Sequence, residues 1–347
     1  MSSAATTTAR PPNAPATHAA LLGSSLLPLL GSSLRSHPDT TPHSSRKRPR
    51  SRVLCLRNRR PTRGQKQGNQ RRVAAAPLIR QRPAGRPPAG QASRLASRLT
   101  GRDRRIALDC YDHRVLTTEQ LCRLHIHNRR VAQRRLGELY QLGVLERFRP
   151  AWQHGEGSTP YHWLLDHAGA QVVAELLELP VKELNWRRDH THQLASSSKL
   201  NHQLAVNDFF SRLAEDARAC GGALEEWWGE RRAAAAFAGR LAPDGYGRLQ
   251  HGNRSTPFLL ELDRGTEPHQ RLQEKADRYS RELPRSDLAH QQPLLLLLTP
   301  TPKRTAAAAD SLAGNSIPIH TATWTPTSDR SPLELVTSAD QSAHHKN

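Results

Sequence analysis

A short run in the second half of the chain, residues 258–263, combines strong apolar character with two acidic residues. Successive side chains of a β-strand point to opposite faces, so the run predicts a largely buried strand with Glu261 and Asp263 on one face. The other face of this strand is apolar and consists of Phe258, Leu260 and Leu262. Burying two carboxylates is unfavourable unless positive groups meet them, so this strand constrains whatever packs against it.

The segment after the strand predicts a helix that supplies a positive charge. Thr266 is placed to cap its N-terminus, and Lys275 lies at the edge of its apolar side. That apolar side repeats at helical spacing and consists of Leu272, Ala276, Tyr279 and Leu283. A lysine that leans inward needs a carboxylate partner, which Glu261 or Asp263 would provide.

A third carboxylate precedes the strand by one predicted hairpin. Asp244 follows a proline and precedes a glycine, where a strand begins or turns. Three carboxylates that meet at strand ends are oxygen ligands suited to a divalent metal such as Mg²⁺. A metal-activated water, together with a lysine that stabilises developing charge, would hydrolyse a phosphodiester. We therefore predict Asp244, Glu261, Asp263 and Lys275 as catalytic residues, with Asp244 and Glu261 as the metal ligands.

Each of these residues also has a purely structural interpretation. Asp244 lies in a Pro-Asp-Gly sequence, which is a strong turn signal by itself. Asp263 would cap the turn at Gly265, and Lys275 would be a surface lysine paired with a neighbouring acid. The sequence alone leaves both interpretations open.

Residues 103–178 predict a first domain of three helices followed by a β-hairpin. The second helix starts with a capping box, in which Thr117 and Gln120 satisfy each other's backbone. This order of elements is that of a winged helix-turn-helix, whose third helix enters the major groove of DNA and whose hairpin forms the wing. The expected elements are helices at 104–113, 116–121 and 128–142, strands at 144–149 and 161–165, and a closing helix at 166–177.

The third helix of this domain has one strongly basic side. The residues on it that would contact DNA are Arg129, Arg130, Gln133 and Arg134. Arginine and glutamine hydrogen-bond to base edges and phosphates, so the predicted partner is double-stranded DNA. A basic face exposed only to solvent, or a winged helix that binds protein, is the alternative, because the fold does not fix the function.

The remaining segments are predicted from their composition. Residues 179–198 are expected to be a linker, 199–324 a second α/β domain with a mixed sheet, and 325–347 a polar, disordered tail. Residues 1–100 carry 19 of the 51 Lys and Arg residues but only one acid, Asp39, which concentrates the net charge of +20 there. This segment predicts a disordered basic arm that binds phosphates without sequence preference. The alternative is that the segment is not a genuine part of the protein, because its start site is placed too far upstream.

Two absences in the sequence bear on the protein's location. The four cysteines are scattered, which indicates a reducing compartment and no disulfide framework. No apolar run approaches the length of a membrane span. We expect a cytoplasmic, nucleoid-associated protein.

The motifs around the acidic strand resemble those of known families. Asp244, Glu261-Leu-Asp263 and Lys275 are similar to the PD-(D/E)xK nuclease core, except that Asp263 stands where that pattern has its lysine; Lys275 on the next helix would take its place. More narrowly, residues 106–300 resemble the replication-relaxation proteins of actinobacterial plasmids and integrative elements. The motifs that carry this resemblance are Leu-Thr-Thr-Glu-Gln-Leu at 116–121, Arg-Arg-Leu-Gly-Glu-Leu at 134–139 and Glu-Leu-Asp-Arg-Gly-Thr-Glu at 261–267.

The resemblance and the patterns together imply an α+β or α/β fold class. A winged helix-turn-helix is followed by a restriction-endonuclease-like domain with a mixed sheet, and disordered tails lie at both ends. Two functions stay open. One is a Mg²⁺-dependent endonuclease or nickase that acts on plasmid or mobile-element DNA, and the other is an inactive DNA-binding replication accessory protein or transcriptional regulator. Plasmid replication or transfer proteins are the expected protein partners.

Overall fold

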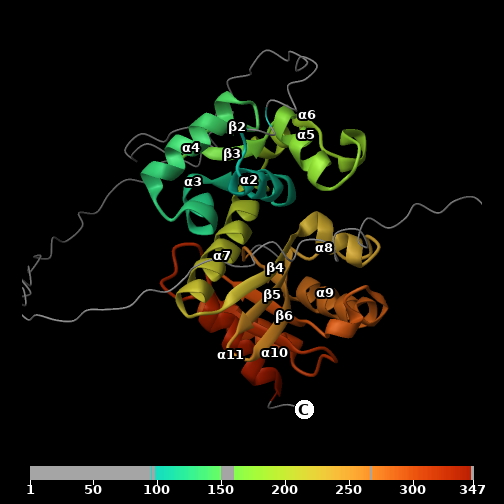
Figure 1. The fold of residues 1–347 in the computed structure, drawn as a ribbon. Helices are drawn as coiled ribbons and strands as arrows, with labels where there is room; N and C mark the ends of the chain where they lie inside the picture. Colours follow the sequence, from blue (N-terminus) through green and yellow to red (C-terminus); the bar gives the residue numbers. More distant parts are fainter. Residues whose placement is uncertain (1–94, 96–97, 150–159, 266–267, 345–347) are drawn as a thin grey trace, which may run out of the picture.

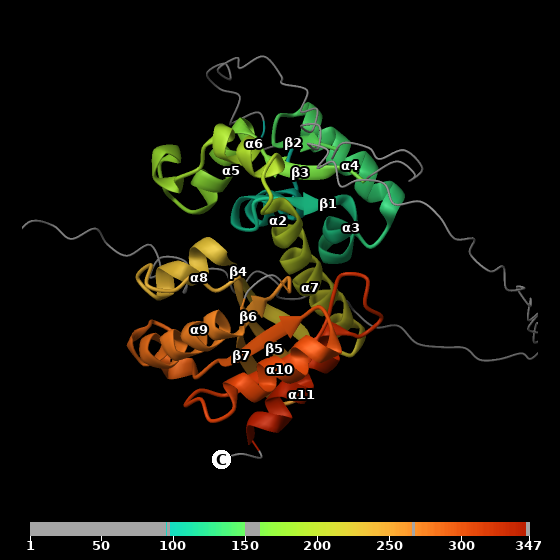
Figure 2. The same ribbon diagram turned by 180° about the vertical axis from the view of Figure 1, so that it is seen from behind.

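Two β-sheets organise the part of the chain that the computed structural model describes, which comprises residue 95 and residues 98–149, 160–265 and 268–344. The smaller sheet has the strand order β1-β3-β2, and the larger has the order β4-β5-β6-β7-β8. Figure 1 and Figure 2 show the small sheet among helices α2 to α6, the large sheet below it, and the long helix α7 between the two. The predicted combination of helices with a mixed sheet is confirmed. Within this part of the chain, every helix is too short or too polar to span a membrane.

Local capping explains where the first helices begin. Thr100 and Asp103 form a capping box at α2, and Thr117 and Gln120 form the predicted capping box at α3. The side chain of Asn128 accepts a hydrogen bond from a backbone N–H in the first turn of α4. The elements are α2 (Gly101–Asp112), β1 (Leu116–Thr117), α3 (Thr118–Leu121), a π-helical turn (Cys122–Ile126), α4 (Arg129–Gln141), β2 (Leu145–Phe148), β3 (His162–Leu165) and α5 (His167–Leu176).

One apolar core joins these elements. Ile106 of α2, Leu136 of α4, Trp163 of β3 and Val173 of α5 are all buried in it. Strands β2 and β3 pair antiparallel and form a hairpin. Helices α2, α3 and α4 precede this hairpin, in the order that the sequence predicts. Most of the predicted hairpin loop lies in residues 150–159, outside the described residues.

The expected linker and the end of the expected basic arm both differ from the sequence expectation. Residues 179–198, expected to be a linker, contain a 3₁₀ turn (Val181–Leu184) and helix α6 (Arg188–Ala195). A buried ion pair holds α6 on the small sheet, since Arg188 Nη2 lies 2.7 Å from Oε2 of Glu146 on β2. Part of residues 1–100 is also folded, because Leu95 and Leu99 are buried in the first core; most of the predicted basic arm lies outside the described residues.

The large sheet mixes antiparallel and parallel pairing. Strands β4, β5 and β6 pair antiparallel, whereas β6, β7 and β8 are parallel and are joined by crossovers that contain α9 and α10. The elements are α7 (Leu200–Ala219), β4 (Ala223–Gly229), α8 (Glu230–Ala236), β5 (Gly245–His251), β6 (Arg254–Leu262), α9 (His269–Glu282), β7 (Leu294–Thr299), α10 (Pro302–Leu312), β8 (Ile319–Thr323) and α11 (Pro332–His344).

Successive side chains of β6 point to opposite faces of this sheet, and helices cover both faces. Phe258 and Leu260 face a core that they share with α7 and α11. Leu259 faces the opposite core, which includes Tyr279 of α9 and residues of α8. The apolar residues of β6 therefore lie on the faces that the sequence predicts. Glu261, two residues after Leu259, lies on the face that α9 covers.

Two glycines of β5 allow α7 to approach the sheet closely. A Cβ atom at Gly247 would lie 2.5 Å from the ring of Phe258 and 2.8 Å from the ring of Phe210, which belongs to α7. A Cβ atom at Gly245 would lie 2.7 Å from the Phe210 ring. Because a side chain at either position would overlap an aromatic ring, this contact requires glycine.

Helix α11 corrects the expectation of a disordered tail at 325–347. Leu335, Val336 and Ala339 are buried against α7 and the large sheet. The residues between them are mostly small and polar, which makes the segment look like a tail although its apolar residues recur at helical spacing.

The packing of α11 gives a stability prediction. We expect Leu335→Ala to lower the free energy of unfolding by about 2–5 kcal/mol, because it removes a fully buried side chain and leaves a cavity. Urea unfolding followed by circular dichroism measures this change. Gln341→Ala, at an exposed position of the same helix, is the matched control and should stay within about 0.5 kcal/mol of wild type. Equal stability of Leu335→Ala and wild type would show that α11 is not part of the fold.

Candidate functional site

The predicted DNA-contacting residues lie together on the outer surface of α4. Arg129, Arg130, Gln133 and Arg134 are all exposed. The opposite side of the helix is fixed in the core by the buried residues Ala132, Leu136 and Leu139. The sequence therefore forces the basic side of α4 to face solvent.

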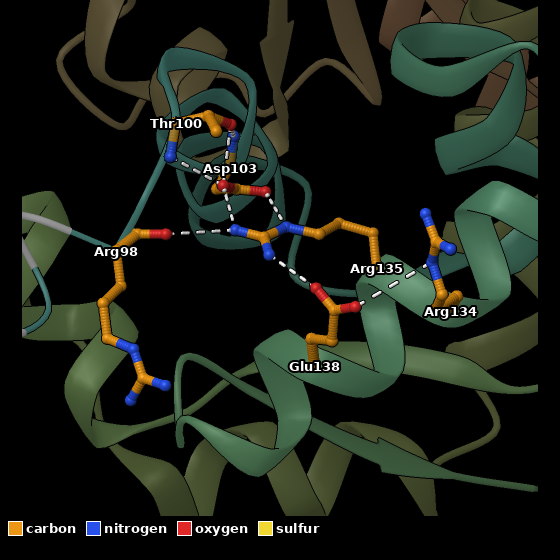
Figure 3. Close-up of polar contacts among 6 residues, drawn as sticks. All are labelled: Arg98, Thr100, Asp103, Arg134, Arg135 and Glu138. Carbon is orange, nitrogen blue, oxygen red and sulfur yellow. Dashed lines mark hydrogen bonds and ion pairs between the residues drawn. The ribbon is translucent and has the colours of Figure 1, made fainter.

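A buried carboxylate anchors α4 to α2 (Figure 3). The guanidinium of Arg135 donates to both oxygens of Asp103, with Nε–Oδ1 at 2.8 Å and Nη2–Oδ2 at 2.5 Å. Asp103 is only 1% exposed, and it also accepts from the backbone and hydroxyl of its capping partner Thr100. Arg135 bonds further to Glu138, which pairs with Arg134 at 3.9 Å.

The pKa of Asp103 reflects these contacts. Burial by itself raises the pKa of this carboxyl, but the hydrogen bonds from Arg135 and Thr100 outweigh burial and lower the pKa below its ordinary value. Asp103 is therefore a charged anchor over the whole neutral range. Its pairing with Arg135 fixes the angle at which α4 presents its basic side.

The large sheet gathers the second group of predicted residues at the end of β6. Glu261 is 2% exposed, and both of its carboxylate oxygens are occupied. Lys275 donates to Oε2 and the hydroxyl of Tyr279 donates to Oε1, both from α9. Lysine and tyrosine are four residues apart on the helix, so they reach the same carboxylate together.

Asp244 lies immediately before β5 and bonds to the same strand. Its Oδ2 atom accepts from the backbone N–H of Leu262 at 2.8 Å, and its Oδ1 atom lies 2.8 Å from Nε2 of His202 on α7. The Pro-Asp-Gly position therefore places the carboxylate across the end of β6, beyond its role in a turn.

Asp263 is the third carboxylate of this group. Its Oδ1 atom accepts from the backbone N–H of Gly265 at 2.8 Å, which is the turn-capping contact that the sequence suggests, and its Oδ2 atom bonds to Arg304 of α10. Each carboxylate thus has its own basic partner, His202, Lys275 or Arg304. We call Asp244, Glu261 and Asp263, with His202, Lys275 and Arg304, the carboxylate cluster.

Protonation in the carboxylate cluster is strongly perturbed. Burial and the nearby charge of Asp244 raise the pKa of Glu261 to about 7, although Lys275 and Tyr279 act in the opposite direction. The hydrogen bond with Asp244 raises the pKa of His202, against the effect of its burial. Glu261 therefore exchanges its proton near neutral pH, and the contact with Asp244 favours the protonated form of His202.

The predicted metal ligands Asp244 and Glu261 are both bonded to side chains of the protein. In the described part of the chain, no three His, Cys, Asp or Glu side chains are grouped so that they could hold a metal ion. A Mg²⁺ ion would have to replace Lys275 and Tyr279 at Glu261 and His202 at Asp244. The carboxylate oxygens that would bind Mg²⁺ are already hydrogen-bonded to these side chains of the protein.

Sequence reasoning identified the carboxylates but missed two of their partners. His202 lies 42 residues before Asp244, and Arg304 lies 41 residues after Asp263. Neither is marked by a local motif, because both contacts depend on how α7 and α10 pack. The only signal was the requirement that a buried carboxylate needs a positive partner.

Comparison with known families adds one finding. A family model described as replication-relaxation matches residues 109–292, just over half of the chain. The matched span contains α4 and all of the carboxylate cluster except Arg304. No curated protein and no solved structure matches the chain.

The raised pKa values give a prediction for stability against pH. Glu261 binds its proton more tightly in the folded state, so its contribution is present at low pH and is lost as pH rises towards about 7, and the raised pKa of His202 acts in the same direction. For Glu261, the free energy of unfolding should fall between roughly pH 5 and 7, by up to about 1.4 kcal/mol per pH unit. Glu261→Gln should lose this decline, and urea unfolding at several pH values measures it.

The exposed residue Glu274 on α9 provides the matched control for this measurement. Glu274→Gln should keep the pH dependence of wild type, because its carboxylate is solvated in the folded state. A Glu261→Gln variant with an unchanged decline would contradict the assignment of Glu261 as a group that titrates near pH 7.

Proposed function

Because the chain belongs to the replication-relaxation family, we propose that it binds double-stranded DNA of plasmids or other mobile elements through α4, as a DNA-binding protein of their replication. The observation that carries this proposal is the exposed basic side of α4, with Arg129, Arg130, Gln133 and Arg134 on one surface.

The arrangement around α4 supports its assignment as the recognition helix of a winged helix-turn-helix. Helices α2, α3 and α4 precede the β2–β3 hairpin, and β1 completes a three-stranded sheet. In such domains the N-terminal residues of the recognition helix contact base edges. The four basic or amide residues lie in the first half of α4, where the N-terminal end of the helix dipole also favours phosphate.

The charges on α4 suit a nucleic-acid partner better than solvent alone. Within the described residues, no carboxylate forms an ion pair with Arg129 or Arg130. Arg135, by contrast, is used to anchor the helix. Arg129 and Arg130 share a face with Gln133. In the major groove, arginine hydrogen-bonds to guanine and glutamine hydrogen-bonds to adenine, so this face has the side chains that recognise both bases.

Metal-dependent cleavage of DNA is the second candidate function. It is favoured by Asp244, Glu261, Asp263 and Lys275 lying together at the end of β6, in a mixed sheet that we assign as restriction-endonuclease-like. The ion pairs within the carboxylate cluster favour the first candidate, because every acid already has a cationic partner. We therefore propose that the cluster is structural, in a DNA-binding accessory protein.

Binding of labelled duplex DNA tests the first function. We expect the triple variant Arg129→Gln, Arg130→Gln, Arg134→Gln to bind at least about tenfold more weakly, because each lost arginine contact costs roughly 1–3 kcal/mol. Fluorescence anisotropy at several salt concentrations measures this loss. The charge-matched control Arg271→Gln, Arg281→Gln, Arg285→Gln changes exposed arginines on and just after α9, and it should retain most of the affinity. Equal affinities of the two triple variants would contradict a role of α4.

Nicking of supercoiled plasmid separates the two candidates. We expect wild-type protein that binds DNA to leave the plasmid intact in Mg²⁺ or Mn²⁺, as it does in EDTA, because the carboxylates are held by His202, Lys275 and Arg304. An Asp244→Asn, Glu261→Gln variant controls for contaminating nucleases. Metal-dependent nicking that this variant lacks would establish cleavage and locate its site in the carboxylate cluster.

A further inference from the structure

A continuous stack of tyrosine and arginine side chains joins α4 to the β2–β3 hairpin. The guanidinium of Arg147 lies 4.5 Å from the ring centroid of Tyr140 and 4.2 Å from that of Tyr161. The guanidinium of Arg149 lies 3.9 Å from the Tyr161 ring. The order is therefore Tyr140, Arg147, Tyr161, Arg149, which we call the hairpin stack.

Strand geometry explains how two arginines share one tyrosine. Arg147 and Arg149 are two residues apart, so both point to the same face of the hairpin, whereas Phe148 between them is buried on the other face. Arg147 pairs in register with Trp163, whose ring centroid is 5.8 Å from its guanidinium. The buried ring of Trp163 thus lies beside the hairpin stack at Arg147, and the stack ends at the exposed Arg149.

The hairpin stack continues the basic side of α4. Tyr140 follows Gln133 by seven residues, which is close to two helical turns, so both side chains point to the same side of α4. The rise between them is about 10 Å. Helix α4 and strand β2 also contact each other and lie side by side in both Figure 1 and Figure 2. Arg147 and Arg149 therefore extend the basic side of α4.

The two guanidiniums are positive groups that the described part of the fold does not neutralise. Among the described residues, no carboxylate forms an ion pair with Arg147 or Arg149. A guanidinium stacked on an aromatic face keeps its N–H donors in its own plane, directed away from the ring. Stacking also restricts the side chain before any ligand binds, which reduces the entropy lost on binding.

We propose that Arg147 and Arg149 bind two backbone phosphates of the same DNA duplex whose groove receives α4, with Tyr161 as the residue that positions both guanidiniums. This proposal rests on the proposed DNA-binding function and adds a second contact region to it. Phosphates carry no sequence information, so the hairpin stack contributes affinity, whereas α4 contributes sequence preference.

The salt dependence of DNA binding tests the proposal directly. The logarithm of the association constant falls linearly with the logarithm of salt concentration, and each phosphate contact adds about 0.9 to the steepness of this fall, which we call the salt slope. We expect Arg147→Gln, Arg149→Gln to lower this slope by about 1.8, and to weaken binding to specific and unrelated duplexes by the same factor. The control Arg271→Gln, Arg281→Gln removes the same charge on α9 and should leave the slope close to wild type.

Tyr161 provides a readout that a purely structural role would not give. Tyr161→Leu removes the ring between the two guanidiniums but keeps both charges, so affinity should fall several-fold while the salt slope stays at the wild-type value. Tyr161→Phe keeps the stack and should bind as wild type does. Should the double arginine variant not fold, Arg149→Gln alone, at an exposed position, should lower the slope by about 0.9.

The outcomes distinguish this inference from the function on which it rests. Wild-type protein that binds no duplex DNA would overturn the proposed function and the inference together. Wild-type protein that binds DNA, with a folded Arg147→Gln, Arg149→Gln or Arg149→Gln variant that keeps the wild-type slope and affinity, would overturn the inference alone. In that case the hairpin stack only stabilises the hairpin.

Discussion

The pairing of buried carboxylates with cations from other elements is the interaction on which both halves of the described structure depend. A buried charge that loses its partner costs about 3–5 kcal/mol, so each pair strongly favours one packing of its two elements. The pairs join α2 to α4, β2 to α6, β6 to α9, and the turn after β6 to α10. They are Asp103 with Arg135, Glu146 with Arg188, Glu261 with Lys275, and Asp263 with Arg304.

The sequence predicted those features that depend on local patterns. The alternation in β6, the inward side of α9 around Lys275 and the capping box at Thr117 all follow from spacing within a few residues, and the structure agrees with each. The sequence did not predict α6 or α11, because both segments are largely polar and only a few of their side chains are buried. It also missed His202 as the partner of Asp244, because that contact depends on the packing of α7 and has no local signature.

Helix α7 connects the small sheet and its helices to the large sheet through side-chain hydrogen bonds and an ion pair. The amide of Asn207, which is fully buried, donates to the backbone carbonyls of His113 and Val115, at 3.2 and 2.5 Å. Arg123 pairs with Asp208 at 2.6 Å. The same helix carries His202 to the carboxylate cluster. A change at α7 therefore affects the surface that presents α4 and the cluster at the end of β6 together.

The ion pairs also bear on the proposed binding of DNA. Three unpaired carboxylates at one edge of the sheet would repel phosphates, whereas carboxylates paired with His202, Lys275 and Arg304 leave little net negative charge there. The span matched by the family model contains α4, α7, Asp244, Glu261 and Lys275 but ends before Arg304. The two pairs that bring α7 and α9 to β6 therefore lie wholly within the segment that defines the family, together with the basic helix. The family segment thus combines an exposed basic helix with a sheet edge whose carboxylates are paired, and α7 joins them.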